Sequence, residues 1–269
     1  GRPMIIKSFD MSVDYAELSS NQPNETAKLT SYILEPELVS KTLWNKRPAI
    51  IVCAGGGYRS RSSREAETIV LKYCAAGFHG FLLDYSIEPT GWPAPTCELS
   101  KAVKTVRAIA DEYFIDPDKI FVCGFSAGGH LSASLGTLWN SSYLKSIFGK
   151  TEIYRPNGLI LSYPVITSGQ FRHEGSIESI IGKNPDNAML ELVSLEKQVT
   201  PDTPKTFIWH CADDGCVPPE NTFDFVKALS LNNVSFECHI FPYGGHGLAL
   251  SDASTAGYDG HINLSLIHI

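Results

Sequence analysis

The sequence predicts a single α/β domain with a mostly parallel central sheet and helices on both faces. Short apolar runs, typical of strands that are buried on both faces, recur along the chain, and segments with helical periodicity fall between them. Alternating strands and helices require crossover connections, which place successive strands in parallel. The length of 269 residues suits one domain of this class better than two small ones.

Residues 5–13 and 28–34 are predicted as strands of an antiparallel edge hairpin, joined by a polar loop at 19–25. From residue 48 onward, apolar runs predict strands at 49–53, 81–83, 120–123, 159–161, 207–209 and 234–241. Helical patterns between them predict helices at 64–76, 96–114, 127–139 and 219–231.

Residues 165–204 interrupt this alternation. They contain only two short helical candidates, at 176–181 and 187–198. Because the segment is too long for a plain loop and too short for a domain, the sequence predicts a small lid inserted over the carboxyl ends of the strands. An ordinary long crossover helix is the alternative that the sequence leaves open.

The end of the chain carries a separate expectation. A final helix is expected to begin near His261, yet the sequence stops at Ile269. The closing run LSLIHI resembles the translation of a common sequencing adaptor. We therefore expect that the natural C-terminus is truncated and that the final residues lack a proper packing partner.

Net charge and cysteine content limit which partners and which cellular compartment are expected. The net charge of −7 disfavours nucleic acid and anionic membrane, which both require clustered Lys and Arg. Seven cysteines without a CxxC pair predict reduced thiols and a cytoplasmic protein. The sequence shows no leader pattern and no apolar run of transmembrane length, although secretion stays open if a leader has been removed.

A serine flanked by glycines marks the predicted functional site. In the run GFSAG, Ser126 follows an apolar strand and precedes a helix, with Gly124 and Gly128 two residues to either side. This pattern predicts a nucleophile elbow, a strained turn that lifts the hydroxyl clear of the sheet and tolerates only small flanking residues. Taken alone the pattern is weak, because chance supplies it in roughly one chain in ten of this length.

The serine requires a base that accepts its proton. His246 is the best candidate among eight histidines, because it follows the last strand in a glycine-rich turn. His130, one helical turn after Ser126, is predicted to pack below the elbow, and His210 lies at a strand end. The histidines without supporting context are His79, His173, His239, His261 and His268.

A carboxylate must orient that histidine, and two adjacent aspartates follow the strand at 207–209. We prefer Asp214, which stands three residues before a Val-Pro pair, a spacing usual for such acid loops. Asp213 is expected to bond the loop backbone, as aspartates in turns commonly do. The chain order of serine, aspartate and histidine is the order of an α/β hydrolase.

The glycine run after the first buried strand is the predicted oxyanion hole. Consecutive glycines allow backbone N–H groups to approach a developing negative charge, and Gly56 and Gly57 are the expected donors together with Ala127. Tyr58 and Trp92 are predicted to border the substrate pocket. Neither phosphate-binding glycine pattern is present and no cluster has metal-ligand spacing, so no cofactor and no metal are expected.

Together these motifs resemble the α/β-hydrolase esterases that include microbial acetylxylan esterases and related carbohydrate esterases. The matching runs are CAGGGY at 53–58, REAE at 64–67, LDYS at 83–86, GFSAGGH at 124–130, WHCADD at 209–214 and GGHG at 244–247. The resemblance covers essentially the whole chain and implies an α/β-hydrolase fold and the removal of short acyl groups from sugars. Ala54 departs from it, since many lipase-like relatives carry the histidine of HGGG there.

The predicted function is a serine carboxylesterase acting on short-chain acyl, chiefly acetyl, esters. A small-molecule or oligosaccharide ester is the expected partner, and the sequence does not decide between a monomer and a homo-oligomer. The alternatives are an amide-cleaving relative, either a peptidase or an arylformamidase, and a feruloyl esterase, because all use the same nucleophile and oxyanion hole. A binding module without activity would require a replaced triad position, and every position is filled.

Overall fold

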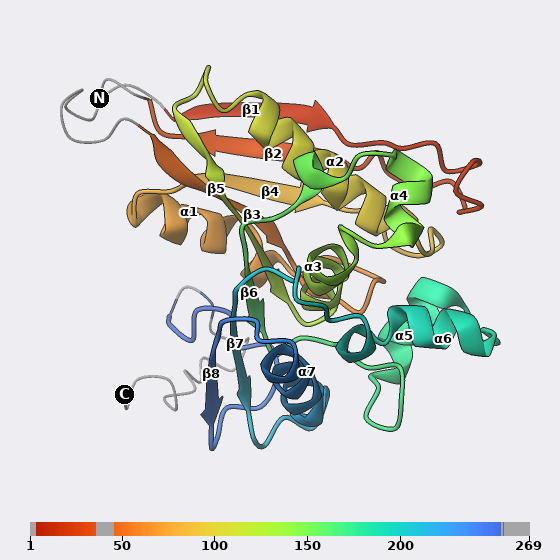
Figure 1. The fold of residues 1–269 in the computed structure, drawn as a ribbon. Coiled ribbons are helices and arrows are strands. Elements are labelled where there is room, and N and C mark those ends of the chain that lie inside the picture. Colours follow the sequence, from red (N-terminus) through yellow and green to blue (C-terminus); the bar gives the residue numbers. More distant parts are fainter. Residues whose placement is uncertain (1–3, 36–45, 254, 256–269) are drawn as a thin grey trace.

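An eight-stranded sheet forms the centre of the computed structural model, which describes residues 4–35, 46–253 and 255 (Figure 1). The strands are β1 (Ile5–Asp10), β2 (Lys28–Ile33), β3 (Arg47–Cys53), β4 (His79–Asp84), β5 (Ile115–Phe125), β6 (Gly158–Ser162), β7 (Thr206–Cys211) and β8 (Phe236–Phe241). Their order across the sheet is β1-β2-β4-β3-β5-β6-β7-β8. The β1·β2 and β2·β4 pairs are antiparallel and the others are parallel, which confirms the predicted fold class.

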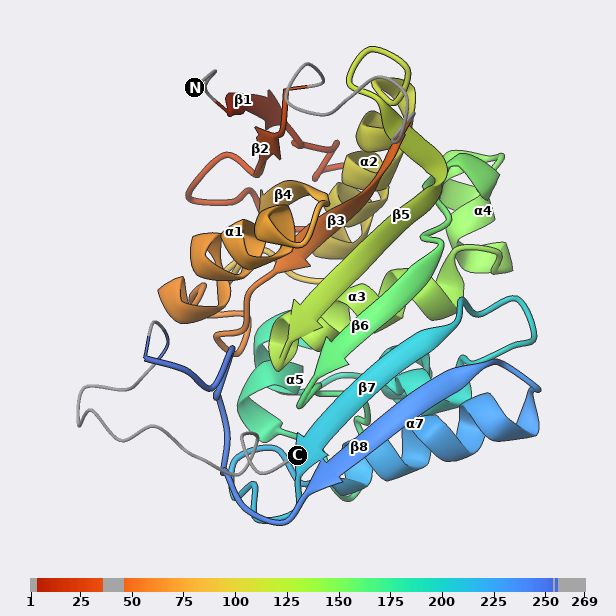
Figure 2. The ribbon, with the colours of Figure 1, turned by 90° about the vertical axis from the view of Figure 1, so that its left-hand side faces the viewer.

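Helices cover both faces of this sheet. They are α1 (Glu67–Ala75), α2 (Ala94–Ala108), α3 (Ala127–Leu138), α4 (Ser142–Phe148), α5 (Glu174–Ile181), α6 (Asn187–Val193) and α7 (Glu220–Leu231). Figure 2 shows α1 on the near face and α2, α3 and α7 on the far face. Alternate residues of β3 point to opposite faces of the sheet. Ile50 and Val52 pack in one cluster with Ile69 of α1. Ala49 and Ile51 belong to the core on the other face. The all-apolar runs of the sequence arise because both faces are buried.

Two local features differ from the sequence predictions. The helix predicted at 96–114 ends at Ala108, because the chain passes through turns and a left-handed residue, Phe114 (φ 57°), to enter β5. The short helix α4 was not predicted. It starts at a side-chain cap, in which Ser141 Oγ accepts a hydrogen bond from Leu144 N at 3.1 Å. Both features depend on local turns that leave little periodic signal.

The segment predicted as a lid contains α5, α6 and the 3₁₀ turn Leu195–Lys197. It is tied to the body of the domain, because Trp92 N donates to Ile180 O at 2.7 Å and Ile166 N donates to Asn221 Oδ1 of α7 at 2.8 Å. Its role as a lid stays a prediction. The predicted terminal helix and C-terminal truncation concern residues 256–269, which lie outside the described residues.

None of the helices in the described part of the chain combines the length and the apolar character needed to cross a membrane.

Glu98 is a buried carboxyl group in α2 that joins three parts of the fold. It accepts hydrogen bonds from Tyr15 Oη at 2.9 Å and Ser86 N at 2.7 Å, and it also contacts Ser86 Oγ. Burial raises the pKa of Glu98 to about 7, which outweighs the lowering by the hydrogen bonds from Ser86 and Tyr15. The ionised form of Glu98 is therefore unfavourable in the folded protein.

Replacing Glu98 with Gln tests this conclusion. Glu98 ionises at about 4.5 in the unfolded chain and at about 7 in the fold, so its ionisation lowers the stability of the wild type as the pH rises between these values. Over this interval we expect the free energy of unfolding of Glu98→Gln to rise, relative to that of the wild type, by on the order of 2–3 kcal/mol. Urea unfolding of both proteins at pH 5 and pH 8 measures the difference, and a difference independent of pH would contradict the assignment.

Candidate active site

The turn between β5 and α3 presents Ser126 in a strained backbone conformation, with φ 53° and ψ −118°. A Cβ atom on Gly124 would lie 2.1 Å from Gly128 O, and one on Gly128 would lie 2.1 Å from Cys53 O. No larger residue fits at either position without moving the main chain. The two glycines of the sequence motif are thus required by contact with the backbone of the neighbouring turn and of β3.

The structure brings Ser126, His246 and Asp214 together. Ser126 Oγ lies 2.9 Å from His246 Nε2, and His246 Nδ1 lies 2.7 Å from Asp214 Oδ2. A carboxylate only accepts hydrogen bonds, so the ring carries a hydrogen on Nδ1 and Nε2 is left to accept from the serine hydroxyl. This arrangement suits a serine nucleophile, a histidine base and an aspartate that orients the base.

Asp214 is held as a carboxylate by its surroundings. Its Oδ1 accepts from the backbone N–H groups of Cys216 and Val217, both at 2.9 Å, and its Oδ2 lies 3.2 Å from His210 Nε2. Burial alone would raise the pKa of Asp214, but the hydrogen bonds from His210 and His246 outweigh it and hold that pKa well below the usual range. The buried carboxylate therefore keeps its charge beside His246.

His210 supports this carboxylate from the end of β7, a role that the sequence did not reveal. Its Nδ1 lies 2.8 Å from Thr222 Oγ1, and its Nε2 lies 2.9 Å from Val217 O as well as near Asp214. Since a carbonyl and a carboxylate only accept, Nε2 carries a hydrogen. His210 thus acts as a hydrogen-bond donor to Asp214.

The adjacent Asp213 makes a different contact. Its Oδ1 accepts from Gly245 N at 2.8 Å, and its side chain is exposed. Asp213 therefore fixes the loop that carries His246 without contacting the imidazole ring. The geometry separates the two aspartates into one that contacts the histidine and one that holds its loop.

The glycine loop after β3 supplies backbone donors near the serine turn. Gly56 (φ 133°) and Gly57 (φ 65°) have backbone conformations that other residues rarely adopt. Within the described ranges, the amides of Gly56, Gly57 and Ala127 have no acceptor in the protein. Gly55 N differs, because it donates to Glu65 Oε2 at 2.7 Å. The loop is therefore anchored by its first amide and leaves the next two available.

Glu65 links this loop to the histidine loop, and the sequence did not predict that role. Its Oε1 accepts from Tyr163 Oη at 2.7 Å, and Tyr163 Oη accepts from Ala249 N at 2.8 Å. The Tyr163 ring also packs edge-on against His246, with 4.9 Å between the ring centroids. Glu65 is buried, so its carboxyl group needs these partners. The sequence signal for Glu65 was its place in the run REAE at 64–67, which did not indicate what the side chain contacts.

Tyr58 and Trp92, the two predicted pocket residues, are packed into the structure around the site. Tyr58 Oη lies 2.9 Å from His130 Nδ1, and His130 Nε2 donates to Val193 O at 2.9 Å. Burial lowers the pKa of His130 to about 4, so this ring stays neutral and packs as predicted from its position in α3. Trp92 Nε1 donates to Tyr143 Oη at 3.0 Å. Neither predicted residue offers a free polar group to a ligand.

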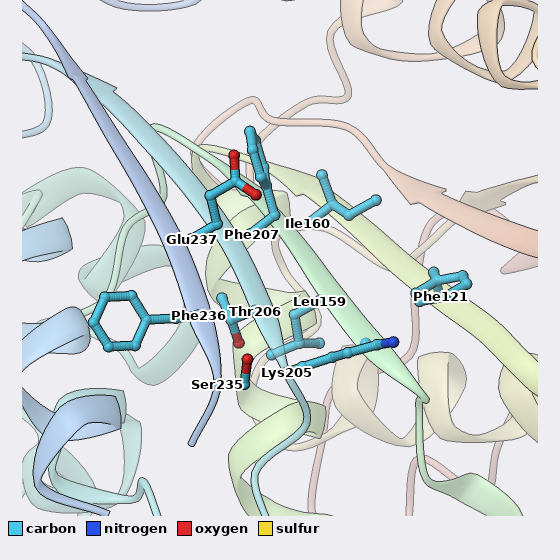
Figure 3. A pocket seen from close by; sticks show the side chains of 10 residues that line it. Phe121, Leu159, Ile160, Lys205, Thr206, Phe207, Ser235, Phe236 and Glu237 are labelled. Atoms are coloured by element: carbon cyan, nitrogen blue, oxygen red, sulfur yellow. The ribbon is translucent and has the colours of Figure 1, made fainter. Parts of the chain in front are cut away.

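A surface hollow of about 380 Å³ lies at the other end of the sheet (Figure 3). Its lining includes Phe121, Leu159, Lys205, Phe207 and Phe236, at or near the amino ends of β6, β7 and β8. Ser126 follows the carboxyl end of β5, so this hollow is separate from the candidate site. Among the described residues, no group of three or more His, Cys, Asp and Glu side chains is placed to hold a metal ion.

A nucleophile turn after a parallel strand, with an acid loop and a histidine loop after later strands, defines an α/β hydrolase. The chain belongs to the BD-FAE family, which matches residues 38–229. It is 36% identical over 252 residues to endo-1,4-beta-xylanase B of Butyrivibrio fibrisolvens, covering 89% of this chain and 39% of that protein. It is 30% identical over 207 residues to an acetylxylan esterase of Xylanibacter ruminicola, covering 74% and 40% respectively.

Solved structures agree with this family. The acetyl ester-xyloside bifunctional hydrolase of Caldicellulosiruptor lactoaceticus superposes with a TM-score of 0.82 at 33% identity, covering 100% of this chain and 96% of that one. The carboxylesterase Cest-2923 of Lactobacillus plantarum gives 0.76 at 26% identity, with 95% and 89% covered. The α/β-hydrolase fold and the resemblance to microbial esterases that the sequence predicted are confirmed. The chain spans about two fifths of the length of the first two curated relatives.

Matched substitutions of the two aspartates separate their roles. Asp214→Asn leaves an amide that cannot orient the His246 ring as a carboxylate does, and we expect kcat for 4-nitrophenyl acetate to fall by roughly a thousandfold or more. Asp213→Asn keeps an oxygen that accepts from Gly245 N, and we expect kcat to change by less than about threefold. Steady-state kinetics of both variants measure the contrast; equal and small losses would contradict the assignment of Asp214.

Proposed function

We propose that the protein is a serine carboxylesterase that hydrolyses short-chain acyl esters, chiefly acetyl esters, of xylan-derived or other carbohydrate substrates. The observation that carries this proposal is the chain of contacts from Ser126 through His246 to Asp214 at the carboxyl edge of the sheet. The substrate class is supported by relatives named acetylxylan esterase and acetyl ester-xyloside bifunctional hydrolase. The expected partner is thus a small-molecule or oligosaccharide ester.

In the first half of the proposed reaction, Ser126 Oγ attacks the ester carbonyl carbon while His246 Nε2 takes the hydroxyl proton. The carbonyl oxygen gains a negative charge, and the amides of Gly56, Gly57 and Ala127 stabilise it. Removing one such donor in other enzymes costs about 10²–10³ in rate. The intermediate then expels the alcohol, which receives the proton from His246, and an acyl-serine remains.

The second half repeats these steps with water. His246 Nε2 takes a proton from water as its oxygen attacks the acyl carbon, and the same amides hold the oxygen. Collapse releases the carboxylic acid and returns the proton to Ser126 Oγ. Throughout, the carboxylate of Asp214 stabilises the imidazolium form of His246, which is why the depressed pKa of Asp214 matters for the chemistry.

A substrate panel with Ser126→Ala tests the proposal. We expect the wild type to favour acetyl over butyryl and feruloyl esters and to leave peptide and formyl-amide substrates intact. Ser126→Ala removes the nucleophile, so we expect a loss of at least about 10³-fold on every ester. A fluorophosphonate probe that labels the wild type but not this variant serves as the control. Unchanged ester hydrolysis by Ser126→Ala would contradict the proposal, and a preference for feruloyl or amide substrates would replace its substrate class.

A further inference from the structure

We propose that His173 donates a hydrogen bond to a hydroxyl oxygen in the alcohol part of the substrate, and so favours esters of polyols over simple esters. This inference rests on the proposed function, because it assigns a specificity residue to the same site. No sequence pattern around His173 indicated a role for it. The structure places it immediately before α5, between two loops that build the site.

The tautomer of His173 follows from its position as the N-terminal cap of α5. Its Nδ1 accepts from Ser176 N at 3.2 Å and lies 2.8 Å from Ser176 Oγ. A backbone N–H can only donate, so Nδ1 is the acceptor and the neutral ring carries its hydrogen on Nε2. Burial, together with the nearby His246, lowers the pKa of His173, so the ring is neutral at neutral pH. Nε2–H is therefore a donor in a fixed direction.

This donor has only a weak partner in the protein. Nε2 lies 3.6 Å from Cys216 Sγ, and Cys216 is exposed. Partial burial of the sulfur, together with the nearby charge of Asp214, raises the pKa of Cys216, so the sulfur stays a neutral thiol and a poor acceptor. An oxygen acceptor brought by a ligand would form a stronger hydrogen bond with Nε2–H than this sulfur does. When a ligand binds, Nε2–H can therefore exchange its contact with Cys216 Sγ for a hydrogen bond to a ligand oxygen.

The neighbours of His173 place it at the candidate site. Cys216, on one side, donates its backbone N–H to Asp214 Oδ1 at 2.9 Å. On the other side, Ser176 Oγ lies 3.9 Å from where a Cβ on Gly57 would stand. His173 and Ser176 therefore connect the acid loop with the glycine loop that supplies the proposed oxyanion donors. A substrate held by these two loops lies within reach of the ring.

The chemistry of an acetyl ester indicates which part of the substrate the donor meets. The acetyl group offers one strong acceptor, its carbonyl oxygen, and the amides of the glycine loop are proposed to donate to that atom. A further donor at the site can therefore form a hydrogen bond only with the alcohol part of the ester. Hydroxyl groups are the acceptors that distinguish a sugar from a simple alcohol, so His173 selects polyol esters.

The charges around His173 favour a neutral alcohol over an anionic one. The guanidinium of Arg59 lies close by, with its Nη1 3.6 Å from the position of a Cβ on Gly175 and His173 Cε1 3.5 Å from the same point. Arg59 is already engaged, because its Nε donates to Ser179 Oγ at 2.9 Å and lies 3.4 Å from Glu88 Oε2. The carboxylate of Glu88 thus offsets the positive charge of Arg59 beside His173.

The substitution His173→Asn tests the inference while keeping α5 capped. Asn is a preferred N-terminal cap and can accept from Ser176 N, but it has no group that replaces Nε2–H. We expect kcat/KM for acetate release from an acetylated xylo-oligosaccharide to fall about three- to tenfold, as for one lost neutral hydrogen bond. For 4-nitrophenyl acetate, whose alcohol carries no hydroxyl group, we expect a change of less than about twofold.

His239→Asn is the matched control, because it makes the same replacement at a partly exposed histidine of β8. It is expected to leave both substrates unchanged. An equal fall on both substrates with His173→Asn, or no fall on either, would overturn the role of His173 and leave the esterase proposal intact. If the wild type cleaves neither ester, or Ser126→Ala cleaves both as well as the wild type, the esterase proposal fails and this inference falls with it.

Discussion

The rest of the site depends on how closely α3 approaches the sheet at Ser126. Gly128 packs so tightly against Cys53 O that only a glycine fits. The turn is also fixed to β6 and the segment after it, because Ser126 N donates to Ser162 O and Val165 N donates to Ser126 O, both at 3.0 Å. A positive φ at a non-glycine residue costs of order 1–3 kcal/mol. The complete burial of α3 holds the residue there, and the serine hydroxyl gains a fixed position.

Two buried carboxyl groups fix the loops around the serine in place. Asp214 accepts from main-chain amides of its own loop and from His210 and His246, whereas Glu65 joins the glycine loop to Tyr163 and the histidine loop. Buried carboxyl groups are unfavourable without such partners, so each group constrains the loops that satisfy it. The reacting groups are consequently positioned by buried polar contacts between segments far apart in the chain.

Much of the fold and part of the site could be predicted because their signals are local. Apolar runs alternating with helical patterns predicted the parallel sheet, and the edge pair β1·β2 was expected from two short strands around a polar loop. The glycines around Ser126 were informative because the turn itself demands them. The end of α2 and the helix α4 were missed, since short turns at the surface lack a period that a sequence pattern can reveal.

Local sequence patterns were sufficient to predict the class of fold and the order of serine, acid and histidine along the chain, because backbone strain and two-sided burial restrict which residues can stand at each position. The three-dimensional arrangement was needed to show that Asp214, and not Asp213, contacts His246, and that Tyr58 and Trp92 are buried. It alone revealed Glu65, His210 and His173. Their roles arise from distances between segments such as His173 and Cys216, which no spacing along the chain encodes.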